Sequence, residues 1–314
     1  MYGSRGYTLS MRSIVAQGLT WYEDENPREE ELRVLQRKYH FHDLDIEDCL
    51  SEHERPKIEE YESYLFLVFH IPFMNQFGRV LKEEVNIFVG SDFIVTLHEG
   101  KIPVLDDLWR ELQRDPLKQE ETLQRGTGFF LYEIMERLFS EGFPILDAIT
   151  KHLRKIEATL FEHEESTNLL RDILALKRNI ITMRSTLLPQ RALIAALEHK
   201  NEKFIPTSLE IYFDNILDAI ERQWALLDRA KELSEALQDT HEAWLTHRTN
   251  AVIRILTIFS VTVLPLNLLE SLYGMNVMLP LQQHPAAFLL IVGAMIFSLV
   301  VFLGYFWWKK WIGY

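Results

Sequence analysis

The stretch Tyr273-Gly274-Met275-Asn276 decides the fold, because it joins two long apolar segments. The first segment, Ala251–Leu272, contains polar residues and one proline, whereas the second, Pro285–Trp308, contains no charged residue. As a helix the second segment would be about 36 Å long, which is enough to cross the roughly 30 Å of bilayer hydrocarbon with some tilt. The sequence therefore predicts a two-helix membrane hairpin that follows a large soluble part.

Basic residues are distributed unequally around these two segments. Arg248 and Arg254 precede or enter the first, and Lys309 and Lys310 follow the second. The intervening residues 277–284 contain no lysine or arginine. Because positively charged loops remain on the cytoplasmic side, we expect a multi-pass protein of the inner (cell) membrane with both termini in the cytoplasm.

Composition excludes several classes of function. The formal net charge is −13, which argues against a nucleic-acid partner and is compatible either with attraction of cations or with simple solubility. The single cysteine, Cys49, excludes an intramolecular disulfide, and packing inside a helix is favoured over a reactive thiol. The sequence contains no Gly-rich phosphate loop, cysteine pair or Ser-His-Asp pattern, so we predict no enzyme and no cofactor beyond a metal cation.

Residues before the membrane hairpin change in character near residue 128. The first part alternates strand signals with helix signals and predicts a mixed α/β unit. Strands are expected at Ser13–Tyr22, Tyr64–Ile71, Val80–Val89 and Asp92–His98, and helices at Arg28–Tyr39 and Leu44–Leu50. Beyond it, no glycine occurs between Gly142 and Gly274, which predicts long helices. These helices are expected at about Phe129–His163, at Thr167–Leu197 and from Ser208 onward, with Thr207 or Ser208 as the cap of the last.

The helix that begins near Ser208 is expected to continue to Tyr273. It would be about 100 Å long and would need neighbouring helices for stability, which suggests an oligomer. The expected divisions are an α/β cytoplasmic domain at 1–128, a cytoplasmic helical hairpin at 129–206, the cytoplasmic part of the long helix at 207–250, membrane spans at 251–273 and 285–308, an external loop at 274–284 and a cytoplasmic tail at 309–314.

Polar residues in the first span recur on one helix face. The steps of three and four residues connect Asn250, Ile253, Thr257, Ser260, Leu264, Asn267 and Ser271. Polar side chains are costly against lipid, and uncharged amides and hydroxyls suit the water shell of a hydrated cation such as Mg²⁺. Two members of this face, Ile253 and Leu264, could form apolar constrictions. The alternative is that the hydroxyls bond to their own helix while Asn267 joins neighbouring helices.

A single two-span chain cannot enclose a path, so a pore requires symmetric assembly. Upstream, the same helix is acidic, and this surface either concentrates or senses cations or is an ordinary solvated face. Its acidic residues are Glu210, Asp214, Asp218, Glu221, Asp228, Glu232, Glu235, Asp239 and Glu242.

The Gly274-Met275-Asn276 motif between two C-terminal spans resembles the CorA family of divalent-cation channels. Asn250, Arg254, Leu256, Thr257 and Pro265 fall where that family has its Asn, a basic residue, a Leu-Thr pair and a Pro. The stretches Leu44–Leu50 and Arg55–Tyr61 look like the cytoplasmic signature of the family.

This resemblance covers essentially the whole chain, and it implies a homopentamer in the membrane lipid with an α/β/α cytoplasmic domain and one long pore-lining helix per subunit. It further implies that Gly274, Met275 and Asn276 form the outer mouth, where Asn276 binds a hydrated ion. Asp239 falls where the family has a long-helix carboxylate of a regulatory Mg²⁺ site.

The sequence departs from the family pattern in four places. Residues 277–284 lack acids, Asn267 replaces a common Thr, and Glu270 and Ser271 replace small residues. The hairpin Phe73–Arg79 offers Asn75 but no carboxylate to partner Asp239. These departures weaken the assignment of a channel for Mg²⁺, with Co²⁺ and Ni²⁺, to Mg²⁺ specifically, and they leave transport of Co²⁺, Ni²⁺ or Zn²⁺ open. A Zn²⁺ transporter of the same fold, with or without proton coupling, is the alternative. A membrane-anchored metal sensor or scaffold is the alternative of another class. Minor metal-ligand candidates are His40, His42 and His284.

Overall fold

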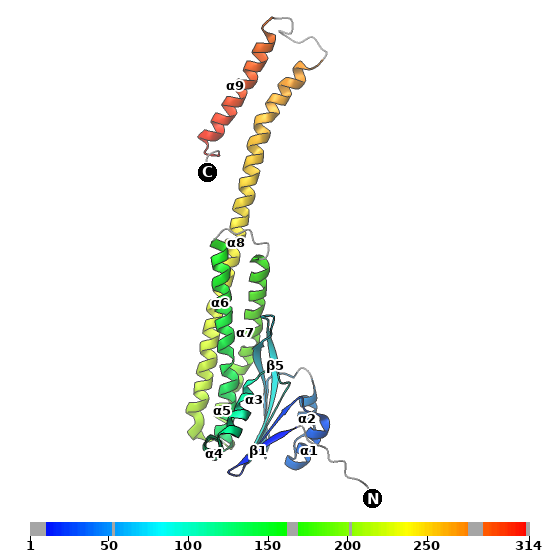
Figure 1. Ribbon diagram of the computed structural model, residues 1–314, viewed down its shortest axis with the longest axis vertical. Coiled ribbons are helices and arrows are strands. Elements are labelled where there is room, and N and C mark those ends of the chain that lie inside the picture. The colour runs from blue at the N-terminus through cyan, green and yellow to red at the C-terminus, as the bar shows by residue number, and fades with distance from the viewer. Residues whose placement is uncertain (1–10, 52–53, 162–168, 201–202, 276–284, 312–314) are drawn as a thin grey trace. The chain divides into compact units, whose positions relative to one another are not determined.

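The computed structural model describes residues 11–51, 54–161, 169–200, 203–275 and 285–311. The chain divides into two compact units, unit 1 (Met1–Leu237) and unit 2 (Gln238–Tyr314). Figure 1 labels the elements, which in chain order are β1 (Arg12–Ala16), β2 (Leu19–Glu25), α1 (Glu29–Tyr39), α2 (Asp43–Leu50), β3 (Lys57–Glu60), β4 (Tyr64–Met74), β5 (Val80–Gly90), β6 (Phe93–His98), α3 (Val104–Arg114), α4 (Pro116–Gln124), α5 (Thr127–Ser140), α6 (Gly142–Phe161), α7 (Leu169–Lys200), α8 (Glu210–Tyr273) and α9 (Ala287–Trp308).

Unit 1 is built around a mixed six-stranded sheet with the order β1-β2-β6-β5-β4-β3. All neighbouring strands are antiparallel except β2 and β6, which are parallel and bring Glu25 opposite His98. The central strands β4, β5 and β6 are almost entirely buried, because helices cover both faces of the sheet. This arrangement places the acidic end of β2 beside His98 at the end of β6.

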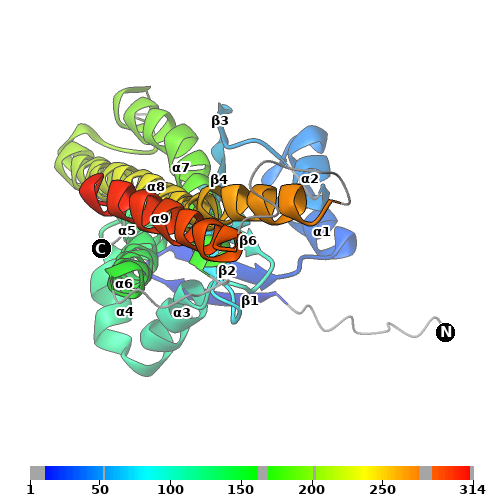
Figure 2. The ribbon, with the colours of Figure 1, turned by 90° about the horizontal axis from the view of Figure 1, so that it is seen from above.

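Two separate hydrophobic cores cover the two sheet faces, because alternate residues of a strand point to opposite sides. On one face, α1 and α2 pack their apolar residues on alternate residues of the strands. On the other face, residues of α3, α5, α7 and α8 pack around Trp21. Figure 2 shows α1 and α2 on one side of the strands and α3 to α6 on the other. The observed layers confirm the predicted α/β/α fold class.

The prediction of one strand over Ser13–Tyr22 is wrong, because the structure has two strands there, β1 and β2. Gln17 and Gly18 both have positive φ angles, 52° and 81°, and form the tight turn of a hairpin. A two-residue turn of this type matches the right-handed twist of the flanking strands. The sequence analysis also assigned no element to β3, α3 or α4, which the structure shows.

The helix predicted over Phe129–His163 is also two helices, α5 and α6, separated at Glu141. Gln223 of α8 explains the break, because its Nε2 donates a hydrogen bond to the carbonyl oxygen of Phe139 at 2.7 Å. A Cβ atom on Gly142 would lie only 2.0 Å from Gln223 Oε1, so the buried amide fits only beside a glycine. The expected cap at Thr207 or Ser208 is likewise replaced by a short 3₁₀ turn before α8.

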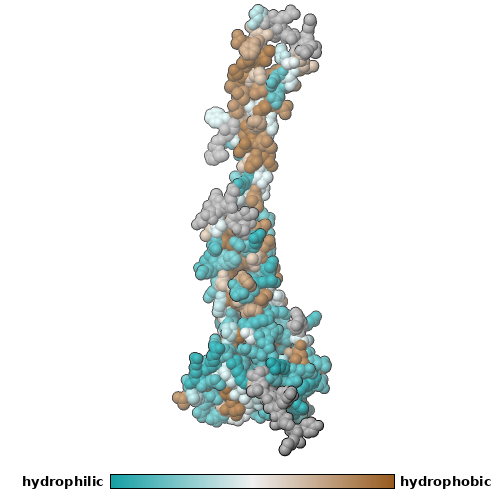
Figure 3. Space-filling model, turned by 45° about the vertical axis from the view of Figure 1, so that its right-hand side comes forward, coloured by the Kyte–Doolittle hydropathy of each residue, from teal (hydrophilic) through white to brown (hydrophobic). Residues whose placement is uncertain are grey.

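Helix α8 confirms the long helix predicted from Ser208, because it runs without interruption from Glu210 to Tyr273 through Pro265. In the described part of the chain, two helices are long and apolar enough to cross a membrane by length and composition, one ending at Tyr273 and the other being α9. Of the residues in the most apolar stretch of each helix, only 6% and 0% are buried, so the chain itself leaves these side chains uncovered. Figure 3 shows hydrophobic side chains concentrated along the helices of unit 2.

Candidate functional site

A row of mostly polar side chains, with two apolar ones, runs along one face of α8 within unit 2. We call it the polar stripe, and its members are Asp239, Glu242, Thr246, Asn250, Ile253, Thr257, Ser260, Leu264, Asn267 and Ser271. All follow at steps of three or four residues, so an unbroken helix aligns them on one side. Thr257 is half-buried and the others are exposed. The sequence analysis predicted the stripe from Asn250 onward but did not single out Thr246, which the same spacing could have identified.

The polar stripe points away from the surface that unit 2 buries. On the opposite face of this part of α8, the half-buried or buried residues include Ala251, Arg254, Ile258, Thr262, Pro265, Leu269 and Tyr273. Thr262 is 6% exposed and lies roughly opposite Ser260 and Leu264 on the helix. The stripe is therefore available to another copy of the chain, to water or to an ion.

The threonines of the stripe bond back to their own helix. Thr257 Oγ1 donates to the carbonyl oxygen of Ile253 at 2.8 Å, and Thr246 Oγ1 donates to that of Glu242 at 2.9 Å. For Thr257 this bond agrees with the alternative considered from the sequence, in which the hydroxyls bond to their own helix. A hydroxyl has one donor and two acceptor positions, so its oxygen can still accept a hydrogen bond from bound water.

The polar stripe ends where α8 ends. The backbone N–H of Gly274 donates to the carbonyl oxygen of Glu270 at 2.9 Å, so the last turn remains helical up to the motif. A Cβ atom on Gly274 would lie 3.1 Å from the same carbonyl oxygen, which is a tight contact. Met275 is 51% exposed. Asn276, the third predicted mouth residue, and His284 lie outside the described residues.

The two residues considered for the predicted regulatory site, Asp239 and Asn75, belong to unit 2 and unit 1 respectively. Asp239 is exposed on α8. In the hairpin between β4 and β5, Asn75 Oδ1 accepts hydrogen bonds from the backbone N–H groups of Phe77 and Arg79, both at 3.0 Å. The Asn75 oxygen therefore holds the turn together, and this use explains the residue without a metal ion.

Unit 1 contains an acidic cluster at the adjacent ends of β2 and β6. The ligand atoms of Glu23, Glu25 and His98 lie within 4.8 Å of one another, but Arg12 forms ion pairs with both glutamates. Burial would raise the pKa of Glu23, but hydrogen bonds from Arg12 and His98 lower it below its usual value. Burial would lower the pKa of His98, but its bonds to Glu23 and Glu83 raise it to about 9. A protein cation already neutralises this cluster.

A second acidic cluster lies where α2 meets β3. Asp45, Asp48 and Glu59 have oxygen atoms within 4.8 Å of one another, and Lys57 contacts Asp48 and lies 3.1 Å from Glu59. Burial raises the pKa of Asp45. This cluster also contains its own cation, so we assign no metal to it.

The minor candidates from the sequence have structural roles. His40 has a φ of 58° and ends α1, and His42 Nδ1 accepts a hydrogen bond from the Leu44 N–H at the start of α2. Burial raises the pKa of Cys49 well above its usual value, which keeps the thiol protonated and inert.

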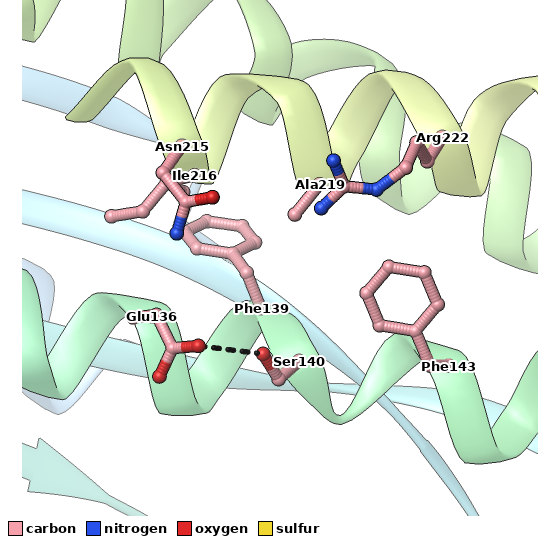
Figure 4. A pocket seen from close by; sticks show the side chains of 8 residues that line it. All are labelled: Glu136, Phe139, Ser140, Phe143, Asn215, Ile216, Ala219 and Arg222. Atoms are coloured by element: carbon pink, nitrogen blue, oxygen red, sulfur yellow. Dashed lines mark hydrogen bonds between the residues drawn. The ribbon is translucent and has the colours of Figure 1, made fainter. Parts of the chain in front are cut away.

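A small cleft of about 260 Å³ lies between α5 and α8 in unit 1. Figure 4 shows its lining, formed by Glu136, Phe139, Ser140, Phe143, Asn215, Ile216, Ala219 and Arg222. Ser140 Oγ donates to Glu136 Oε1 at 3.4 Å. The cleft is smaller than the roughly 300–1,000 Å³ typical of small-molecule sites.

Comparisons with known proteins agree on one family. The family described as CorA-like Mg²⁺ transporter protein matches residues 16–310. The Bacillus subtilis protein YfjQ, named as a metal ion transporter, is 30% identical over 259 residues, which cover 82% of this chain and 78% of that protein. The cobalt/magnesium transport protein CorA of Thermotoga maritima is 24% identical over 290 residues, covering 89% of this chain and 80% of that protein.

A solved structure shares the same fold. The complete structure of the CorA magnesium transporter from Methanocaldococcus jannaschii has a TM-score of 0.83 and 22% sequence identity, covering 94% of this chain and 92% of that chain. The similarity therefore extends over the α/β unit, the long helix and the apolar helices together.

Proposed function

The chain belongs to the family of CorA-like Mg²⁺ transporter proteins, and we propose that it forms a homopentameric membrane channel for hydrated divalent cations. We propose Mg²⁺ as the principal ion, with Co²⁺ or Ni²⁺ as further ions, because the name of the Thermotoga maritima relative includes cobalt and magnesium. The family is one of transporters rather than of enzymes.

The observation that supports this proposal most strongly is the exposed polar stripe of α8. The rest of the span exposes hydrophobic side chains such as Ile255 (68%) and Phe259 (65%), which suit lipid or neighbouring helices. Amides and hydroxyls at Asn250, Thr257 and Asn267 would be costly against lipid. They can accept hydrogen bonds from the water shell that Mg²⁺ gives up reluctantly. A simple membrane anchor needs no such face.

Assembly follows from the position of the stripe. One helix offers one side of a path, so copies of α8 must surround an axis with their stripes facing it. Asp239 and Glu242 would then form rings of carboxylates that concentrate cations below the span. Ile253 and Leu264 would form apolar rings at which the path can close by losing water. We also propose that Asp239 binds a regulatory cation between subunits.

The mouth of the path is proposed at Gly274, Met275 and Asn276. The exposed end of α8 at Met275 supports this location. The amide oxygen of Asn276 would bind a hydrated ion, and a side chain at Gly274 would lie in tight contact with the Glu270 carbonyl. The spans are proposed at 251–273 and 285–308, with residues 274–284 outside and both termini in the cytoplasm.

The test is flux into liposomes reconstituted with the full chain, comparing Mg²⁺, Co²⁺, Ni²⁺ and Zn²⁺ with and without a pH gradient. We expect Asn276→Ala to abolish Mg²⁺ entry while the assembled protein remains intact by light scattering. Asn267→Leu should reduce the flux at least about tenfold, because each subunit loses a hydrogen bond worth about 1 kcal/mol to the hydrated ion. The matched control is Phe259→Leu, on another face of the same helix, which should retain normal flux.

Three results would contradict the proposal. Unchanged flux in assembled Asn276→Ala protein would exclude the mouth assignment. Equal flux in Asn267→Leu and Phe259→Leu would exclude the polar stripe as the lining of the path. Transport of Zn²⁺ alone, driven by a pH gradient, would identify a zinc transporter of the same fold.

A further inference from the structure

A groove of about 470 Å³ lies between α7 and α8 in unit 1, and we call it the α7–α8 groove. Two hydrogen bonds between the helices set their alignment. Arg184 of α7 donates to Asp228 of α8 at 2.5 Å. Arg191 donates to Glu221 at 2.7 Å, so the bonds advance along α7 as they go back along α8, and the two helices run antiparallel. The groove is within the roughly 300–1,000 Å³ typical of small-molecule sites.

The walls of the α7–α8 groove are apolar side chains that the chain leaves uncovered. Ile181 and Leu188 of α7 line the groove and are 58% and 54% exposed. Two helical turns separate them, so they lie on the same side of α7. Trp224 of α8 is half-buried, and the Cζ atom of Arg184 lies 4.4 Å from the centroid of its ring. These side chains offer a flat, largely apolar surface to the body of a ligand.

Ser234 of α8 supplies a buried polar group to the lining of the groove. It is 3% exposed, and its Oγ has no hydrogen-bond partner within the part of the chain that the structure describes. A hydroxyl inside a helix can bond to the carbonyl oxygen four residues earlier, as those of Thr246 and Thr257 do in the same helix. A buried hydroxyl without a partner is unfavourable, and a polar atom of a ligand in the groove would satisfy it.

The charged residues of the groove favour an anion. Lys177, Arg184 and Lys231 line it against one acid, Glu235, in a chain whose formal net charge is −13. Asp228 already engages Arg184, so we assign the contact with an anion to Lys231. Lys231 lies 3.3 Å from Glu235 on the same helix, but the two side chains are 48% and 45% exposed, and such pairs contribute little to stability. An anionic ligand can therefore compete for the Lys231 ammonium group.

We propose that the α7–α8 groove binds a small aromatic acid, whose rings pack against Trp224 and whose carboxylate meets Lys231 and Ser234. Helical spacing places these three residues on one side of α8, because Lys231 is two turns after Trp224 and Ser234 is one turn further. The rise from Trp224 to Lys231 is about 10 Å, which suits an acid with two fused rings. The site does not depend on the proposed transport function, because all its residues lie in unit 1.

The test is isothermal titration calorimetry of the full chain in detergent with naphthoate and with its neutral analogue naphthalenemethanol, each corrected by a titration into empty micelles. We expect saturable binding of naphthoate, at least about tenfold tighter than that of the alcohol, because the Lys231 bond is charge-assisted. Lys231→Glu should remove this difference, and Ser234→Ala should weaken naphthoate binding about fivefold. The matched control Lys151→Glu makes the same charge change at an exposed residue of α6 and should bind naphthoate as the native chain does.

Three results would overturn the proposal. If the native chain shows no saturable binding of naphthoate, the groove is not a ligand site, as when another copy of the chain covers it. Equal affinity for the acid and the alcohol would show an apolar surface without an anion site. Native affinity for naphthoate in Lys231→Glu would exclude the assigned contact, and if that variant does not fold, Lys231→Gln is tested by the same criterion.

Discussion

Replacement of Thr96 by valine tests how the centre of unit 1 is held together. Thr96 and Trp21 are both 0% exposed, and Trp21 Nε1 donates a hydrogen bond to Thr96 Oγ1 at 3.0 Å. The indole ring lies 5.3 Å from the ring of Trp109 and 5.1 Å from that of Phe130, measured between ring centroids. The hydrogen bond therefore orients the side chain around which β2, β6, α3 and α5 pack.

The expected magnitude follows from what valine removes. Valine has the shape of threonine but no acceptor, so Trp21 would keep a buried N–H group without a partner, at a cost of about 1–3 kcal/mol. Thr96→Ser is the matched control, because it keeps the acceptor and loses only a methyl group, worth about 1 kcal/mol. For a unit of this size, each 1 kcal/mol lowers the thermal midpoint by roughly 2–4 °C.

The assay is thermal unfolding of the full chain in detergent at a fixed scan rate, combined with a double-mutant cycle. In a Trp21→Phe background the donor is absent, so Thr96→Val should lower the midpoint much less than it does in the native chain. An equal loss in both backgrounds would refute the argument, because the cost would then come from packing and not from the Trp21 hydrogen bond.

Two further perturbations test other buried contacts in unit 1. Because the pKa of His98 is raised to about 9 from 6.5, its stabilising contribution of about 3 kcal/mol should be fully present below pH 6.5 and lost as the pH rises through about 9. His98→Gln should abolish that part of the pH dependence of the thermal midpoint, and persistence of the full dependence would exclude His98 as its source. Gly142→Ala should displace Gln223, leave the Phe139 carbonyl unpaired and destabilise the chain by about 1–3 kcal/mol. In a Gln223→Ala background the same change should cost much less, and a full additive loss would contradict this explanation.

The candidate site was predictable where it depends on a single helix. Steps of three and four residues place Asn250, Thr257 and Asn267 on one side of α8 whatever surrounds it, since helical geometry is local. The extension of the stripe to Asp239 follows from the same spacing, because α8 continues unbroken as the sequence predicted. The role of Asn75 was not predictable, because its use by backbone N–H groups depends on how the hairpin turns.

The sequence by itself determined the elements that a local pattern of apolar residues identifies. These are the long helix α8, the apolar helix α9 and the buried strands β4 to β6. Tertiary structure alone decided the features that join residues far apart in the chain. The break at Glu141 depends on an amide from α8, the pairing of β2 with β6 brings Glu25 opposite His98, and the layers around the sheet bury Asp24. The physical reason is that periodicity reports which face of an element is buried, whereas hydrogen bonds and pKa values depend on which groups the fold brings together.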